Sequence, residues 1–374
     1  MITLDAHFLE ALRLGTTEAQ VGHPFPWSLF DRKGRLLIRR GTMLETSAQL
    51  LELSRQAAFR LKHERDAADV KPDSPFFVIG EMMGRLSSLL GLLATGRAEA
   101  LPPLQELATA IQVLCAADAD AALAALHLDR EGKYTVRHLI HSAVLVELVG
   151  YRLGYAPNQR HTLVCATLTA NVGMLELQER LLQQGAISSE QRREIDTHPE
   201  RSVDLLRAAG VDDAIWLESV LQHHERADGG GYPRGLRGGD IGLGARLIAL
   251  ADIYHAKVSD RLYRPAMAPT EALRQVFLGQ GKDVDRNLAG LFIKELGVFP
   301  PGGFVRLTNG DLAVVTHRGH DGLSPRVASL MTPRGAPYAR PLPRDTGHKD
   351  FAIRQTAIRD ESLLLTDLLP LWGC

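Results

Sequence analysis

The feature that constrains this fold most is a continuous run of helical patterns between residues 131 and about 298. Apolar residues recur there at the three- and four-residue spacing that puts them on one face of an α-helix. The clearest segments are HLIHSAVLVELVGYRLG, RHTLVCATLTANVGMLELQERLLQQG, SEQRREIDTHPERSVDLLRAAG, AIWLESVLQHHE and LGARLIALADIYHAKVSD. We therefore expect a mainly α protein whose body is a helical bundle.

The segments before this run predict a small α+β unit and a helical connection. Residues 27–30 and 35–38 are short strand candidates, and a helix capped by Thr46 or Ser47 is expected to run to about Lys62. A charged, proline-broken stretch then leads into helical patterns that reach residue 128. The two helical segments divide at Pro102 and Pro103 and could form a hairpin or stalk, by packing in the core or at a dimer interface.

After residue 300 the pattern changes to one typical of strands. β-branched residues alternate around Asn309 and Gly310, a pair suited to a tight hairpin turn, and PRVASLM predicts a further strand. The expected organisation is an α+β unit at 1–65, a linker and helical hairpin at 66–127, a helical domain at 128–300 and a β-rich appendage at 301–374.

Composition narrows the classes of function. The chain has 374 residues, a formal net charge of −1 and 45% apolar residues, which is typical of a globular protein without a basic surface for nucleic acid. It has no run of eighteen apolar residues, so no membrane span is expected. Its three cysteines lack CxxC spacing, which favours a reduced, cytoplasmic setting.

Histidines and one aspartate on separate helical segments suggest a metal site. The pair His223 and His224 precedes a glycine-rich loop, while His138, His198 and Asp252 lie on other segments. Imidazole and carboxylate groups gathered from several helices suit divalent first-row metals. A single histidine on an apolar helix is more often a satisfied core residue, but an unpaired buried carboxylate such as that of Asp252 is costly.

Residues 134–301 resemble the HD-GYP domain, a bacterial subfamily of the HD phosphohydrolases. The resemblance is carried by YTVRHL, THPE, QHHERADGGGYPRGLRGGDI, ARLIALADIYHA, SDRLYRPAM and GVFPPG. It implies an all-helical domain that binds two or three metal ions, often iron or manganese. It also implies hydrolysis of the bacterial second messenger cyclic di-GMP.

The resemblance assigns roles to individual positions. The implied metal ligands are His138, His198, His223, His224 and Asp252. Arg261 and Arg264 match basic residues that contact ligand phosphates, a task that suits the forked guanidinium group. Gly231, Tyr232 and Pro233 match the GYP motif, which is implicated in recognising substrate or partners such as GGDEF-domain proteins.

The central family motif, Leu-His-Asp-[Ile/Val]-Gly-Lys, is degenerate here. The chain reads Leu-Thr-Ala-Asn-Val-Gly-Met, and Gly173 fixes the register. Ala170 then stands at the histidine position, Asn171 at the bridging aspartate, which is the degenerate catalytic position, and Met174 at the lysine. A metal therefore loses one ligand, and two metals lose the carboxylate between them, on which hydrolysis by a metal pair depends.

Two histidines near the retained ligands could compensate. His255 lies three residues after Asp252, where the family usually has aspartate, and His141 lies three after His138. A rearranged mononuclear site that includes His255 is one alternative. A hydrogen-bonded polar core without metal is the other.

Three functions stay open at this point. The first is a signalling module that binds cyclic di-GMP or a partner protein but is impaired in hydrolysis. The second is an active metal-dependent cyclic di-GMP phosphodiesterase with an altered metal centre. The third is a structural or dimerising scaffold, for which the helices at 76–127 could supply a homodimer interface.

Overall fold

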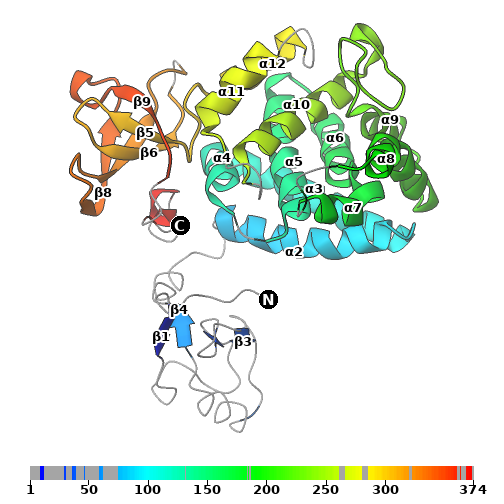
Figure 1. The fold of residues 1–374 in the computed structure, drawn as a ribbon, viewed down its shortest axis with the longest axis horizontal. Coiled ribbons are helices and arrows are strands. Elements are labelled where there is room, and N and C mark those ends of the chain that lie inside the picture. The colour runs from blue at the N-terminus through cyan, green and yellow to red at the C-terminus, as the bar shows by residue number, and fades with distance from the viewer. Residues whose placement is uncertain are drawn as a thin grey trace. The chain divides into compact units, whose positions relative to one another are not determined.

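The computed structural model (Figure 1) describes residues 75–130, 132–182, 184, 187–260, 266–279, 285–319, 322–359, 363 and 368–372, together with residue 46 and four short strands before them. Contacts divide the chain into two compact units. One contains residues 75–361, and the other contains residues 1–74 with 362–374.

The smaller unit contains a four-stranded antiparallel sheet in the order β1-β4-β2-β3. Its strands are β1 (Leu9–Ala11), β2 (Leu29–Phe30), β3 (Leu36–Ile38) and β4 (Phe59–Leu61). β2 and β3 confirm the predicted strands. β4 corrects the end of the helix predicted to reach Lys62, because Phe59-Arg60-Leu61 alternates with the period of a strand and pairs with β1. The rest of that helix falls outside the described residues.

The larger unit is mainly helical, which confirms the predicted fold class. Its helices are α2 (Pro75–Leu93), α3 (Leu101–Ala117), α4 (Ala119–Leu128), α5 (Tyr134–Arg152), α6 (Pro157–Thr169), α7 (Leu175–Leu181), α8 (Ser189–Ala208), α9 (Ala214–Gln222), α10 (Leu243–Val258), α11 (Pro269–Leu278) and α12 (Arg286–Leu296). Short 3₁₀ turns occur at η3 (Ala98–Ala100), η4 (Val172–Met174) and η5 (Gly238–Asp240).

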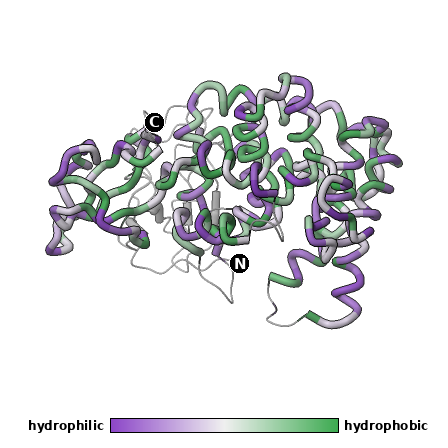
Figure 2. The backbone as a smooth tube through the Cα atoms, turned by 90° about the horizontal axis from the view of Figure 1, so that it is seen from above, coloured by the Kyte–Doolittle hydropathy of each residue, from purple (hydrophilic) through white to green (hydrophobic). Residues whose placement is uncertain are grey.

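Helix α5 is the centre of this unit. Every residue from Tyr134 to Gly150 is buried, and α5 packs against α2, α3, α4, α6, α10 and α12. Figure 1 shows α5 enclosed by these neighbours, and Figure 2 colours much of this interior as hydrophobic. α5 is buried on all sides although it carries polar residues such as Arg137, His138 and Glu147. Polar side chains on α5 are therefore held in a buried environment.

The predicted hairpin helices pack against this centre. By length and composition alone α2 could cross a membrane, but residues along its length, among them Ile79, Leu86 and Leu90, are buried against protein. The segment predicted as a single helix over 101–128 is divided at Asp118. Its carboxylate accepts a hydrogen bond from Ala121 N at 2.9 Å and so starts α4 as a new helix.

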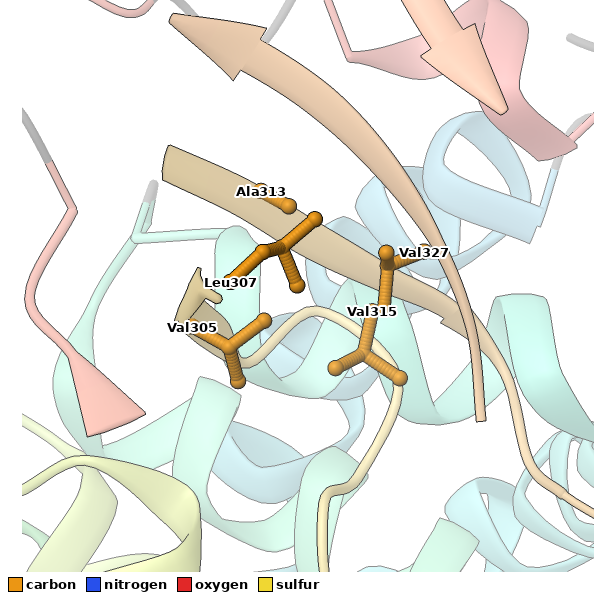
Figure 3. Close-up of a cluster of buried hydrophobic side chains, with 5 residues drawn as sticks. All are labelled: Val305, Leu307, Ala313, Val315 and Val327. Carbon is orange, nitrogen blue, oxygen red and sulfur yellow. The ribbon is translucent and has the colours of Figure 1, made fainter. Parts of the chain in front are cut away.

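The C-terminal part of the larger unit is an antiparallel five-stranded sheet in the order β8-β7-β6-β5-β9. The strands are β5 (Phe304–Leu307), β6 (Leu312–His317), β7 (Arg326–Met331), β8 (Pro337–Asp345) and β9 (Ile353–Ala357). β5 and β6 confirm the hairpin predicted around Asn309, and β7 confirms the further strand. Alternate residues form one buried core, which Figure 3 shows as Val305, Leu307, Ala313, Val315 and Val327.

Candidate metal centre

Four parts of the helical body bring the histidines together. His138 and His141 lie one turn apart on α5, and His255 lies on α10 near Asp252. His198 lies in the middle of α8, and His223 and His224 directly follow α9. The contacts of α5 with α10, of α8 with α9 and of α9 with α10 place these side chains around one region.

His198, His223 and His224 form the three-histidine cluster. One ring nitrogen from each lies within 4.8 Å of the others. His198 Nδ1 contacts the carbonyl oxygen of Ile195 at 2.7 Å, and His223 Nδ1 contacts that of Val220 at 2.6 Å. A carbonyl oxygen only accepts, so both Nδ1 atoms carry the proton and both Nε2 atoms carry a lone pair. These two Nε2 atoms face each other at 3.4 Å.

Burial keeps the cluster neutral. It lowers the pKa of His198 to about 3, with a further contribution from His223. Burial also lowers the pKa of His223 and holds that of His224 well below its ordinary value. Neutral imidazole is the form that binds metal. Among the described residues, His224 Nε2 is buried and has no hydrogen-bond partner.

The degenerate motif lies where α6 ends. Ala170 and Asn171 follow the last residue of α6 and are 3% and 2% exposed, so the predicted polar break is a buried turn. Asn171 Oδ1 has no hydrogen-bond partner among the described residues. A Cβ atom on Gly173 would lie 2.7 Å from the carbonyl oxygen of His198, so only glycine lets this turn approach α8 so closely.

His138, His255 and His141 form a second group, the imidazole chain, which begins at Asp252. His138 Nε2 lies 2.6 Å from Asp252 Oδ1, and His138 Nδ1 lies 2.8 Å from His255 Nδ1. The other nitrogen of His255 lies 3.1 Å from His141 Nδ1. Burial would raise the pKa of Asp252, but the hydrogen bond from His138 and the surrounding imidazoles outweigh it and hold that pKa well below its usual range.

Hydrogen bonds to Glu225 hold the glycine-rich loop beside the three-histidine cluster. The Glu225 carboxylate accepts hydrogen bonds from Arg234 N at 2.7 Å and Leu236 N at 2.9 Å. A Cβ on Gly231 would overlap the backbone of Glu225, so the loop requires glycine there. The Tyr232 ring stacks on His224 with 4.8 Å between ring centroids. The GYP segment is therefore part of the wall of the site.

Comparison with known proteins bears on this arrangement. A family profile described as HD domain matches residues 119–288. The solved structure of Bd1817, an HDG"Y"P protein from Bdellovibrio bacteriovorus, has a TM-score of 0.52 at 16% identity and covers 76% of this chain and 98% of that one. This likeness concerns the fold alone. Residues 119–288 therefore match the HD-domain family, and the fold is similar to that of an HD-GYP protein.

Curated proteins similar to this chain include cyclic dinucleotide phosphodiesterases. Cyclic di-GMP phosphodiesterase PA4108 of Pseudomonas aeruginosa is 30% identical over 217 residues, which are 58% of this chain and 52% of the relative. The 3′3′-cGAMP-specific phosphodiesterase 1 of Vibrio cholerae is 31% identical over 154 residues, which are 41% of this chain and 36% of the relative. The chain thus spans about half the length, or less, of these curated relatives.

A cavity of about 340 Å³ opens over the HD-domain site. His223, His224, Tyr232 and Asp252 line it. The cationic side chains of Arg192 on α8, Lys257 on α10 and Arg226 in the glycine-rich loop also line it, and no sequence pattern distinguishes them from the many other charged residues. The predicted phosphate-binding residues Arg261 and Arg264 lie outside the described residues.

The residues present fit one divalent cation. Three neutral imidazoles offer a ligand set. Among the described residues, His224 Nε2 has no hydrogen-bond partner and Asn171 Oδ1 is an acceptor without a donor. Nitrogen-rich sites of this kind suit zinc and iron, and they bind manganese more weakly. A cation bound there would polarise a phosphate oxygen. His138 and Asp252 stay predicted ligands, but their mutual contact occupies the atoms that each would use.

His255 does not lie where a compensating ligand would be needed. It contacts Nδ1 of His138, whereas Asp252 contacts Nε2 on the opposite side of the same ring. One cation cannot use both sides of the ring, so the rearranged site that includes both His138 and His255 does not match this geometry. His255 instead orients His138, as outer-shell partners orient the ligands of metal sites.

Proposed function

We propose that this HD domain binds cyclic di-GMP in a bacterial signalling pathway and is impaired in hydrolysing it. The observation that carries the proposal is the buried turn at Ala170 and Asn171, where the family's histidine and bridging aspartate would stand. Ala170 has no donor atom and Asn171 is neutral. Hydrolysis that depends on two bridged cations loses the group that holds them together.

Binding is supported by the cavity and by the names of the relatives. The cavity is lined by cationic groups and by the aromatic ring of Tyr232, which suit the phosphates and bases of a cyclic dinucleotide. Arg192 lies over this ring, 5.7 Å from its centroid, and is held by Asp196 at 2.9 Å. A signalling output through a GGDEF-type or other partner at the GYP loop rests on the family resemblance.

Calorimetry with cyclic di-GMP tests the binding. We expect Arg192→Ala to weaken it about tenfold, the typical value of a hydrogen bond to a charged group. Arg193→Ala is the matched control, because Arg193 is the exposed neighbour that does not line the cavity. Equal affinity in both variants would place the nucleotide elsewhere. No binding at micromolar concentration would favour a structural scaffold.

An active phosphodiesterase with an altered metal centre is the second candidate, because the three-histidine cluster is intact. We expect the wild-type chain to hydrolyse cyclic di-GMP no faster than His223→Ala does. Turnover that disappears in His223→Ala would instead establish the second candidate.

A further inference from the structure

The two histidine groups differ in the direction of their hydrogen bonds. In the three-histidine cluster, backbone carbonyls fix the protons of His198 and His223 on Nδ1 and leave Nε2 free to bind a cation. In the imidazole chain, the first acceptor is the Asp252 carboxylate, so His138 carries its proton on Nε2.

The nitrogen that carries the proton in His138 determines which nitrogen carries it in His255 and in His141. When each ring carries one proton, His138 Nδ1 can only accept, so His255 donates from its own Nδ1 across 2.8 Å. His255 Nε2 then accepts from His141 Nδ1 at 3.1 Å, and Ser259 Oγ lies 3.1 Å from the same nitrogen. A single arrangement of protons therefore satisfies all three contacts.

This arrangement opposes metal binding at His138. To become a ligand beside Asp252, His138 must move its proton from Nε2 to Nδ1, which reverses the protons of His255 and His141 in turn. With the protons reversed, the last N–H of the imidazole chain lies at His141 Nε2, a buried atom with no hydrogen-bond partner among the described residues. A buried donor without an acceptor is rarer and costlier than an unpaired acceptor, and this cost subtracts directly from metal affinity.

The position that a cation would take between His138 and Asp252 also lacks further ligands. Ala170 contributes no donor atom there, and Asn171 contributes no charge. Asp252 would be the one anionic ligand among the described residues, and it already accepts from His138.

We propose that this HD domain holds a single cation, at His198, His223 and His224, and that the imidazole chain closes the second cation position. His255 and His141 are positioning residues that act through His138. The inference concerns the number of metal ions and does not depend on which nucleotide binds.

Manganese binding by the full chain tests the inference. The chain is treated with chelator, loaded with Mn²⁺ alone, passed through gel filtration and analysed for bound metal and by electron paramagnetic resonance. We expect one ion per chain with the six-line spectrum of isolated Mn²⁺. Two ions, an exchange-coupled spectrum, or no ion at millimolar Mn²⁺ would overturn the proposal.

Two variants show which group holds the ion. We expect His223→Ala to weaken Mn²⁺ binding on the order of 100-fold or more, because it removes a ligand. His138→Gln keeps an N–H for Asp252 and should leave affinity within about threefold, since a residue outside the ligand set contributes little. Equal losses in both variants would overturn the proposal.

Melting curves in chelator show whether each variant is folded. If His138→Gln does not fold, His141→Gln replaces it with the same expectation and the same contradicting result. Calorimetry with cyclic di-GMP is run separately, so a wrong metal count and a wrong nucleotide can be told apart.

Discussion

The three-histidine cluster and the imidazole chain lie in one helical body, yet they use the same side chain in opposite ways. In the cluster, His198 and His223 turn their lone pairs toward each other at 3.4 Å. In the imidazole chain, each contact pairs a proton with a lone pair, from His141 through His255 and His138 to Asp252. Identical imidazoles thus direct a lone pair or a proton at their neighbour according to the partner that fixes their first proton.

Restoring the family motif should give the largest change. We expect Ala170→His, Asn171→Asp, Met174→Lys and His255→Asp together to bind a second Mn²⁺. Hydrolysis of cyclic di-GMP should rise on the order of 1,000-fold, since a second cation stabilises the leaving oxygen. Elemental analysis and a hydrolysis assay measure the two results.

The same chain without His255→Asp is the control for this experiment. It should bind the second ion more weakly, because the imidazole chain still directs the proton of His138 toward Asp252. A four-substitution chain that binds one ion would refute our account of the motif.

The buried turn that contains Gly173 packs closely against α8, so a substitution at Gly173 disturbs the three-histidine cluster and not the imidazole chain. Gly173→Ala puts a Cβ 2.7 Å from the His198 carbonyl oxygen and 2.8 Å from Ser202 N. We expect a loss of about 3 kcal/mol in the free energy of unfolding, at the upper end of overpacking costs, and weaker Mn²⁺ binding because His198 shifts.

Gly290→Ala is the matched control, because nothing lies within 4 Å of a Cβ there and alanine favours helix. Denaturant unfolding of both variants measures the difference. Equal stability of the two would show that the turn tolerates a side chain.

Acid should destabilise the fold through its neutral histidines, and His127 isolates one that belongs to neither group. Its Nδ1 lies 2.7 Å from the carbonyl oxygen of Pro301 and its Nε2 lies 2.7 Å from Tyr254 Oη, and burial lowers its pKa to about 4. The unfolded chain takes up this proton near pH 6.5, so the stabilisation is complete above that pH and is lost as pH falls toward 4.

Between pH 6.5 and 5.0, protonation of the unfolded chain at one fully buried histidine lowers the free energy of unfolding by about 2 kcal/mol. We therefore expect the wild-type chain to lose about that much more stability than His127→Gln over the same interval, measured by denaturant unfolding at each pH. The acid loss that remains in His127→Gln belongs to the other buried histidines. Identical pH profiles would show that His127 is protonated equally in both states.

Much of the fold followed from sequence because its signals are local. Helical periodicity placed the body, Asn309 and Gly310 marked the hairpin, and the polar break after Thr169 ends α6. The division at Asp118 was missed because one capping carboxylate interrupts an otherwise continuous apolar pattern. The strand at Phe59–Leu61 was missed because its partners are distant in sequence.

The sequence predicted which residues form the candidate site but not what each of them contacts. The sequence identified His138, His198, His223, His224 and Asp252, and the structure brings them to one region. Spacing could not show that His255 contacts the far side of the His138 ring, since this depends on the packing of α10 against α5. Arg192 gave no signal because one exposed arginine on α8 resembles its neighbours.

The most direct measurement is the tautomer of each histidine in the metal-free chain at pH 7.5. Two-bond proton–nitrogen correlation spectra of the ¹⁵N-histidine-labelled protein report it, with single-histidine variants for assignment. Our account predicts protons on Nδ1 of His198 and His223 and on Nε2 of His138. A proton on Nδ1 of His138 would contradict it, because that ring would then present its lone pair to a second cation.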